Sequence, residues 1–183
     1  LYAKLKAFEN DPRNQLIRNI KVNENGQTIR KELNVIAVNY YFRTMVNLKK
    51  EYPEASFVHI FDSTTSNEYR RQIDPEYKAN RKSKDIEQEQ CIEALKGALK
   101  VLQAVVYDEP NFEADDVIAT IATKIALANK TIGIVSNDKD LSQIVAYAPD
   151  FIRLLQPEYD QNQGRNVYKE LDSELIKEKY GVY

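Results

Sequence analysis

The stretch that constrains the fold most is residues 113–138, which read EADDVIATIATKIALANKTIGIVSND. Apolar residues at positions 117, 118, 121, 122 and 125 have helical spacing, so we predict a helix from Glu113 to about Ala128. The short apolar run at 131–135 is rich in β-branched residues and predicts a buried strand. A helix followed directly by a buried strand is typical of α/β proteins, whose helices cover a parallel sheet.

Similar patterns recur on both sides of this stretch. Short apolar runs predict strands at 58–61, 105–107 and 151–155, and helical spacing predicts helices at 29–50, 85–104 and 173–180. Strands that alternate with long helices form parallel β-α units. We therefore expect an α/β fold with a central, mostly parallel sheet flanked by helices, in which a ligand binds beyond the carboxyl ends of the strands.

The composition indicates a folded protein with one core. The chain has 183 residues, of which 43% are hydrophobic and 30% are charged. Its apolar runs are too short to cross a bilayer, so we expect no membrane partner. The single cysteine, Cys91, allows neither an internal disulfide nor a cysteine zinc site, which favours a reducing, intracellular and cytoplasmic location. The five glycines are scattered and form no phosphate loop, so we expect no small-molecule cofactor.

Acidic residues lie at three places next to the predicted strands and helices. Asp62 ends one strand, three acidic residues open the helix at 113, and two more follow the strand at 131–135. The full set is Asp62, Glu113, Asp115, Asp116, Asp138 and Asp140. Carboxylates at one sheet edge would repel one another unless they bound cations, and oxygen ligands favour Mg²⁺ or Mn²⁺ over zinc. Two such ions would support phosphodiester hydrolysis.

Each acidic residue also has a purely structural interpretation. Asp138 stands where a helix N-cap belongs, and Asp115 and Asp116 lie in a first helical turn, where the helix dipole favours negative charge. Asp62 could simply open a turn. His59, the single histidine, lies within a predicted strand, where a hydrogen-bonded structural role is favoured over that of a general base. Carboxylates from three separate strand ends nevertheless favour a metal site.

Residues 67–84 form a basic segment between Asp62 and the helix expected from position 85. The net charge of the whole chain is −2, but this segment contains Arg70, Arg71, Lys78, Arg81, Lys82 and Lys84. Tyr69 and Tyr77 alternate with these cations, a pattern that suits backbone phosphates and stacked bases. Lys78 and Arg81 are three positions apart, so on a helix they would share a face and could neutralise one phosphate. The alternative is a solvated surface segment.

These motifs together resemble the 5′ nuclease superfamily, which includes flap endonucleases and the 5′-to-3′ exonuclease domain of bacterial DNA polymerase I. The resemblance spans about residues 57–181. It is carried, in order, by Phe61-Asp62, Tyr69-Arg70, Tyr77-Lys78-Ala79-Asn80-Arg81, Phe112-Glu113-Ala114-Asp115-Asp116, Ser136-Asn137-Asp138-Lys139-Asp140 and Lys179-Tyr180-Gly181. The acidic motifs at 113–116 and 138–140 are specific in combination, whereas either one alone would be weak.

The resemblance implies a PIN-like catalytic core with a basic helical arch or clamp at 67–84. It implies that the six carboxylates are metal ligands for two Mg²⁺ or Mn²⁺ ions, and that Lys78, Arg81 and Asp116 are catalytic. The residues expected to contact DNA are Tyr69, Arg70, Arg71, Tyr77, Lys78, Arg81 and Lys82. The family's usual first strand and its C-terminal helix-hairpin-helix have no counterpart here, so we expect residues 1–183 to be a fragment of one catalytic core.

The expected function is that of a 5′-3′ exonuclease or flap endonuclease in replication and repair. Its partners would be 5′ flaps and 5′ ends of DNA, and also RNA–DNA hybrids. Three alternatives remain open: a nucleic-acid-binding module without catalysis, a PIN-like ribonuclease, and a phospho-acceptor domain with an acidic Mg²⁺ pocket. The last leaves the basic segment without a role. Metal-dependent cutting of DNA or RNA separates the others.

Overall fold

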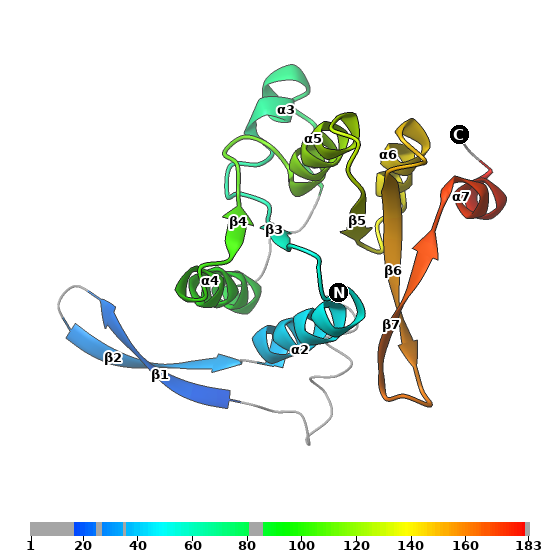
Figure 1. Ribbon diagram of the computed structural model, residues 1–183. Helices are drawn as coiled ribbons and strands as arrows, with labels where there is room; N and C mark the ends of the chain where they lie inside the picture. Colours follow the sequence, from blue (N-terminus) through cyan, green and yellow to red (C-terminus); the bar gives the residue numbers. More distant parts are fainter. Residues whose placement is uncertain (1–16, 25–26, 35, 81–85, 182–183) are drawn as a thin grey trace. The chain divides into compact units, whose positions relative to one another are not determined.

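A computed structural model describes residues 17–24, 27–34, 36–80 and 86–181 of the chain. The chain divides into two compact units, the first made of residues 1–59 and 78–106 and the second of residues 60–77 and 107–183. Figure 1 shows the elements along the sequence. The assignment of the whole chain to a single catalytic core stays a prediction. No helix in the described part of the chain combines the length and the apolar character that a membrane crossing requires.

The first unit contains a β-hairpin and two long helices. Strands β1 (Ile17–Glu24) and β2 (Gln27–Asn34) pair in antiparallel fashion. Helices α2 (Ile36–Glu51) and α4 (Ile86–Val101) pack against each other. Leu48 of α2 and Leu95 and Leu99 of α4 are buried. The strands β3 (Val58–Ile60) and β4 (Val105–Tyr107) form a separate two-stranded sheet.

The helix predicted at 29–50 is wrong in its first part. Residues 27–34 form strand β2, and the helix begins only at Ile36. Ile29 and Leu33 are four positions apart, which imitates helical spacing in a single sequence. The pairing of β2 with β1, from Ile17↔Asn34 to Glu24↔Gln27, overrides that local pattern.

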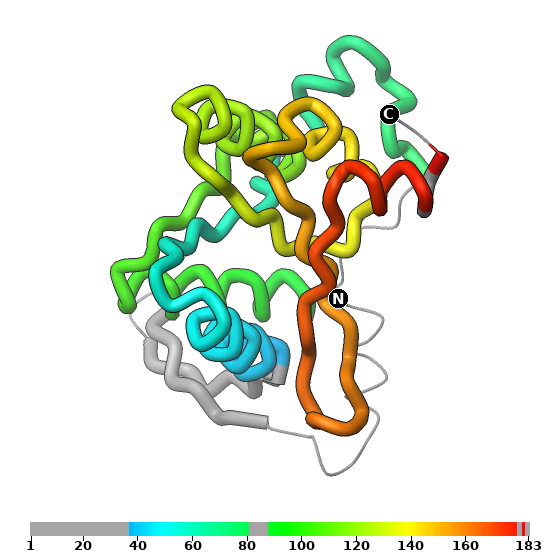
Figure 2. Tube along the Cα trace, turned by 45° about the vertical axis from the view of Figure 1, so that its right-hand side comes forward, coloured from blue at the N-terminus to red at the C-terminus, as the bar shows by residue number. Residues whose placement is uncertain are grey.

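The second unit is built on a three-stranded sheet of β5 (Ile132–Val135), β6 (Ile152–Asp160) and β7 (Arg165–Leu171). Strand β5 pairs with β6 in parallel, as predicted for an α/β protein. Strand β7 was not predicted, and it pairs with β6 in antiparallel fashion. Figure 2 shows β6 and β7 as one long hairpin. The expected sheet is therefore only partly parallel, and β3 and β4 pair outside it.

Helices cover this sheet and enclose the main core. Helix α5 (Ala114–Leu127) contacts β5, α6 (Ser142–Tyr147) contacts β6, and α7 (Ser173–Tyr180) contacts β7. The fully buried side chains include Ile152 and Leu154 of β6. The buried cluster consists of Ala122, Ala126, Ile134, Leu141, Val145, Ile152, Leu154, Leu171 and Ile176. The predicted helices at 113–128 and 173–180 are confirmed, and Gly181 ends α7 with a φ of 67°.

The basic segment differs from the arch that was expected. Residues Glu68–Ile73 form the short helix α3, but residues 75–80 form turns. Lys78 has a φ of 55°, which is a left-handed and not a helical conformation. Arg81 and Lys82 lie outside the described residues. Lys78 therefore does not lie on a helix, so the structure does not show the helical face that it was expected to share with Arg81. The arch is not confirmed.

Candidate metal and nucleic-acid site

Three of the predicted acidic residues, Asp62, Glu113 and Asp116, lie at the N-terminus of α5. Asp62 follows β3, and its Oδ1 accepts a hydrogen bond from the backbone N–H of Ala114 at 2.9 Å. Ala114 is the first residue of α5, whose leading N–H groups have no partner within the helix. The positive end of the helix dipole also favours a carboxylate at this place. The contact thus fixes the end of one strand to the start of the helix that contains the other carboxylates.

Glu113 and Asp116 are joined to each other through this helix start. The Oδ2 of Asp116 accepts a hydrogen bond from the backbone N–H of Glu113 at 3.2 Å, and the N–H of Asp116 donates to the backbone carbonyl of Glu113 at 3.1 Å. Glu113 is only 6% exposed. A buried carboxylate beside a second carboxylate needs a nearby positive charge or several hydrogen-bond donors.

Arg70 supplies that positive charge. Its Nη2 lies 2.6 Å from Asp116 Oδ1, and its Nη1 lies 3.1 Å from Glu113 Oε2. Arg70 belongs to α3, so the contact joins the basic segment to the acidic helix start. The guanidinium fork places one nitrogen on each carboxylate, a geometry that lysine could not reproduce.

Tyr77 closes the same network. Its hydroxyl accepts a hydrogen bond from Arg70 Nη1 at 2.7 Å and donates one to Glu113 Oε2 at 3.0 Å. The guanidinium carbon of Arg70 also lies 5.3 Å from the centre of the Tyr77 ring. The hydrogen bond with Tyr77 and the charges of Asp116 and Glu113 raise the pKa of Arg70 above its usual value, although burial acts in the opposite direction. Arg70 is therefore a permanent cation at this site.

The carboxylates after β5 form a local structure of their own. Asp138 caps the short 3-10 helix η2 (Lys139–Leu141), and its Oδ1 accepts a hydrogen bond from the N–H of Asp140 at 2.9 Å. The N-cap interpretation of Asp138 is thus confirmed. Asp115 lies in the first turn of α5 with an exposed side chain, as the helix-dipole interpretation expects. Metal binding by Asp115, Asp138 and Asp140 stays a prediction.

The structure brings Asp62, Glu113 and Asp116 to one place, but their oxygens do not surround a common point. Within the described ranges, no group of three or more His, Cys, Asp or Glu residues is arranged to hold a metal ion. The donors are nevertheless all carboxylate oxygens, which suits a hard divalent cation. Two of the three already hold a cation, namely Arg70. The chemistry of these carboxylates therefore suits a metal ion, although the guanidinium of Arg70 contacts two of them.

Two exposed aromatic rings flank this cluster. Tyr69 precedes Arg70 and is 51% exposed, and Phe112 precedes Glu113 and is 44% exposed. Their ring centres are 5.9 Å apart. The sequence predicted Tyr69 as a nucleic-acid contact but missed Phe112. An exposed aromatic side chain next to a charged cluster makes Phe112 a further candidate contact, and this exposure could be seen only in the structure.

His59 has the structural role that its position predicted. It is buried, and its Nδ1 lies 2.6 Å from the hydroxyl of Tyr41. Burial lowers the pKa of His59 and raises the pKa of Tyr41 to about 12. Burial thus favours the neutral form of the imidazole, whose Nδ1 shares a hydrogen bond with the phenol. Both residues belong to the first unit.

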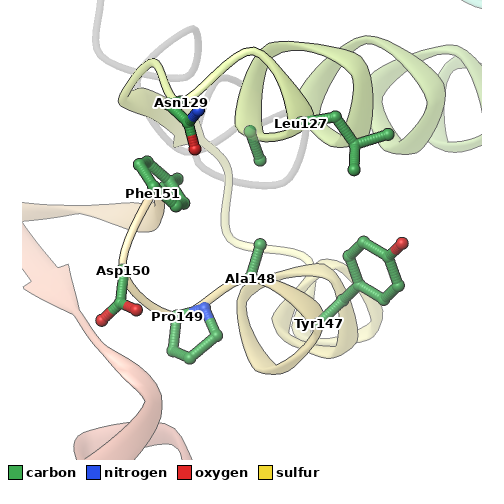
Figure 3. Close-up of a pocket in the computed structure, with 8 residues that line it drawn as sticks. Leu127, Asn129, Tyr147, Ala148, Pro149, Asp150 and Phe151 are labelled. Atoms are coloured by element: carbon green, nitrogen blue, oxygen red, sulfur yellow. The ribbon is translucent and has the colours of Figure 1, made fainter.

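A pocket of about 380 Å³ lies at the opposite end of α5 from Glu113. Leu127 and Asn129 line it from the end of α5, and Tyr147, Pro149 and Phe151 line it from α6 and the turn that follows (Figure 3). It contains no residue that the sequence predicted for the site. The carboxylate cluster is not a part of this pocket.

Comparisons with known proteins show which family the chain resembles. Residues 15–181 match the family described as the 5'-3' exonuclease, N-terminal resolvase-like domain. The chain is 33% identical over 159 residues to DNA polymerase I of Mycobacterium tuberculosis, a match that covers 87% of the chain and 17% of the polymerase. It is 32% identical over 148 residues to a 5'-3' exonuclease of Buchnera aphidicola, which covers 80% of the chain and 47% of that protein. The chain thus spans less than half the length of these relatives.

A solved structure supports the fold. The bacteriophage T5 flap endonuclease, crystallised with DNA and metal ions, superposes with a TM-score of 0.58 over 79% of this chain and 53% of its own, at 22% identity. At this identity the similarity establishes the α/β architecture. The family match ends where the predicted resemblance ends but begins earlier, at residue 15 and not at about residue 57. The chain therefore belongs to the family of 5'-3' exonuclease N-terminal, resolvase-like domains.

Proposed function

We propose that this chain hydrolyses phosphodiester bonds in DNA as a metal-dependent 5′-3′ exonuclease and flap endonuclease. The observation that carries the proposal is the joining of Asp62, Glu113 and Asp116 at the start of α5 with Arg70 from the basic segment. Acidic ligands and a phosphate-binding cation thus lie within one compact unit. The relatives named as DNA polymerase I and 5'-3' exonuclease support the same activity.

In this proposal the carboxylates hold two Mg²⁺ or Mn²⁺ ions. When bound, the ions would stabilise the charge of the attacking and leaving oxygens and lower the pKa of the attacking water. Asp62, Glu113 and Asp116 would hold one ion, because the start of α5 joins them. Asp115, Asp138 and Asp140 complete the proposed ligand set. Asp116 is the proposed catalytic ligand, since its two oxygens contact both Arg70 and the helix start.

The basic segment is proposed to hold the nucleic acid. Arg70 carries guanidinium donors suited to a phosphate, and Tyr69 presents an exposed ring suited to a base. Lys78 and Arg81 are proposed to neutralise the scissile phosphate as catalytic cations. The proposed DNA contacts in full are Tyr69, Arg70, Arg71, Tyr77, Lys78, Arg81 and Lys82. DNA flaps and 5′ ends are the proposed substrates, with RNA–DNA hybrids as further ones.

The test is cleavage of a 5′-labelled DNA flap, its single-stranded counterpart and an RNA copy, each with Mg²⁺, Mn²⁺ or chelator. We expect metal-dependent cutting of the flap near its junction. Asp116→Asn should lower the rate by about 100-fold or more, the scale of losing a group that stabilises transition-state charge. Asp150→Asn is the control, because it makes the same change at an exposed aspartate that lines the distant pocket.

Three outcomes would contradict parts of the proposal. Binding of the flap without metal-dependent cutting would favour a nucleic-acid-binding module. Preference for the RNA copy would favour a ribonuclease. Equal cutting by Asp116→Asn and the unchanged chain would remove Asp116 from the catalytic site, provided that Asp150→Asn behaves in the same way.

A further inference from the structure

Arg70 makes its two ion pairs with carboxylates that the proposed function assigns to a metal. Its Nη2 is 2.6 Å from Asp116 and its Nη1 is 3.1 Å from Glu113. An Asp or Glu oxygen that accepts a charged hydrogen bond at this distance has little room for a divalent ion on the same side, since Mg²⁺ needs ligands at about 2.1 Å in near-octahedral geometry. The guanidinium and the ion would therefore need the same oxygens.

The charges show why both cations suit this place. Glu113 is buried, with a side chain that is 8% exposed, while the side chains of Asp116 and Arg70 are 33% and 38% exposed. A buried carboxylate without any cation would be strongly unfavourable. Arg70 brings one positive charge to two carboxylates, whereas a divalent ion brings two. The ion neutralises the pair more completely, and Arg70 neutralises it in part.

Tyr77 provides Arg70 with a second place of attachment. Its hydroxyl accepts from Arg70 Nη1 at 2.7 Å, and its ring lies 5.3 Å from the guanidinium carbon. These contacts do not involve Asp116. Arg70 can therefore lose Asp116 and remain on Tyr77, with Nη2 turned away from the carboxylate and available for another anion.

We propose that Arg70 and a divalent ion compete for Glu113 and Asp116, so that Arg70 sets the metal affinity of the site and is released toward substrate phosphate when metal binds. This inference rests on the proposed function, because it takes the carboxylates to be metal ligands. Linkage requires the effect to be mutual: if metal weakens the hold of the carboxylates on Arg70, then Arg70 weakens metal binding by the same factor.

Calorimetric titration with MnCl₂ at constant ionic strength tests this competition without relying on activity. We expect Arg70→Gln to bind Mn²⁺ about five-fold or more tightly than the unchanged chain, the scale of losing two partly exposed ion pairs. Arg71→Gln is the matched control. It removes the same charge from the same helix, and the Arg71 side chain is exposed, so its effect on Mn²⁺ affinity should stay below about two-fold.

Thermal melting gives a second readout. Glu113 and Asp116 lose their cation in Arg70→Gln, so this variant should melt at a lower temperature than the unchanged chain in chelator. Its melting temperature should also rise further on addition of Mn²⁺. If Arg70→Gln fails to fold, Arg70→Lys replaces it, because lysine keeps the charge but loses the fork. We expect its Mn²⁺ affinity to be higher than that of the unchanged chain.

The outcomes separate this inference from the proposed function. If the unchanged chain does not bind Mn²⁺, or if Asp116→Asn binds it equally well, the proposed metal site fails and the competition fails with it. If the unchanged chain binds Mn²⁺ through Asp116 but Arg70→Gln, or Arg70→Lys in its place, binds no more tightly, only the competition is overturned. Tighter binding by Arg71→Gln to the same degree would also overturn it, since general charge would then explain the effect.

Discussion

The carboxylate of Asp62 accepts a hydrogen bond from the backbone N–H of Ala114, at 2.9 Å and across 52 positions of the sequence. One side chain thus serves two purposes in the proposed site: it satisfies the first N–H group of α5 and contributes a charge beside Glu113. Two substitutions can separate these purposes.

Asp62→Asn keeps an oxygen acceptor and loses the charge, whereas Asp62→Ala loses both. We expect Asp62→Ala to lower the free energy of unfolding by about 1 kcal/mol, the usual cost of losing a side-chain acceptor at a helix N-terminus, and Asp62→Asn to lower it by less than half of that. Both should weaken Mn²⁺ binding. Urea denaturation and calorimetric titration measure the two effects, and equal loss of stability in both variants would contradict the role of the hydrogen bond.

Tyr77→Phe tests the bridge between Arg70 and Glu113. The variant keeps the ring near the guanidinium but removes the hydroxyl that contacts both partners, so we expect a loss of about 1 kcal/mol in the free energy of unfolding. Urea denaturation provides the measurement. Tyr147→Phe is the control, because Tyr147 is 65% exposed, and its hydroxyl should contribute almost nothing. A similar loss in both variants would mean that the bridge adds no stability.

The pair of Tyr69 and Phe112 should stack on a nucleobase of the bound strand. We expect Tyr69→Ala and Phe112→Ala each to weaken the binding of single-stranded DNA by about 1 kcal/mol or more, the lower end of the range for one stacked base. Binding can be followed by the fluorescence of 2-aminopurine, which stacking quenches. Tyr159→Ala removes an exposed ring from β6 and should leave binding unchanged. No change on losing either Tyr69 or Phe112 would rule out stacking here.

His59 should make the stability of the chain sensitive to acid. Burial lowers its pKa below the usual 6.5, so below about pH 6.5 the unfolded chain takes up a proton that the folded chain does not. The free energy of unfolding should therefore fall as the pH falls from about 6.5 toward the lowered pKa of the folded state. His59→Gln should be less stable at pH 7.5 but should lose less on going to pH 5.5. Parallel slopes for the two proteins in urea denaturation would contradict this role.

The elements predicted from the sequence are those whose signals are local. Helix α5 has regular apolar spacing and acidic residues in its first turn, and α7 ends at a glycine, so both could be located within a few residues. Strand β2 was missed because its conformation depends on pairing with β1, and β7 because it depends on pairing with β6. Pairing with a neighbouring strand leaves no periodic pattern in the strand itself.

The candidate site shows the same limit. The sequence identified Asp62, Glu113 and Asp116, because acidic residues at strand ends and helix starts can be read directly. It assigned Arg70 and Tyr77 to nucleic acid and did not predict that both contact Glu113. Those contacts require Arg70 of α3 and Tyr77 of the turns that follow it to meet the start of α5 across 36 to 46 positions, which only tertiary packing determines.

The interleaved composition of the two units also has a consequence for the order of folding. Each unit is made of two separate segments. Residues 60–77 of the second unit are separated from its remaining residues by residues 78–106, which belong to the first unit. During synthesis, Arg70 leaves the ribosome 46 residues before Asp116, the carboxylate that it contacts. The nascent chain must therefore keep α3 without its acidic partners until α5 emerges. We expect a chain stopped near residue 106 to contain every residue of the first unit but only residues 60–77 of the second.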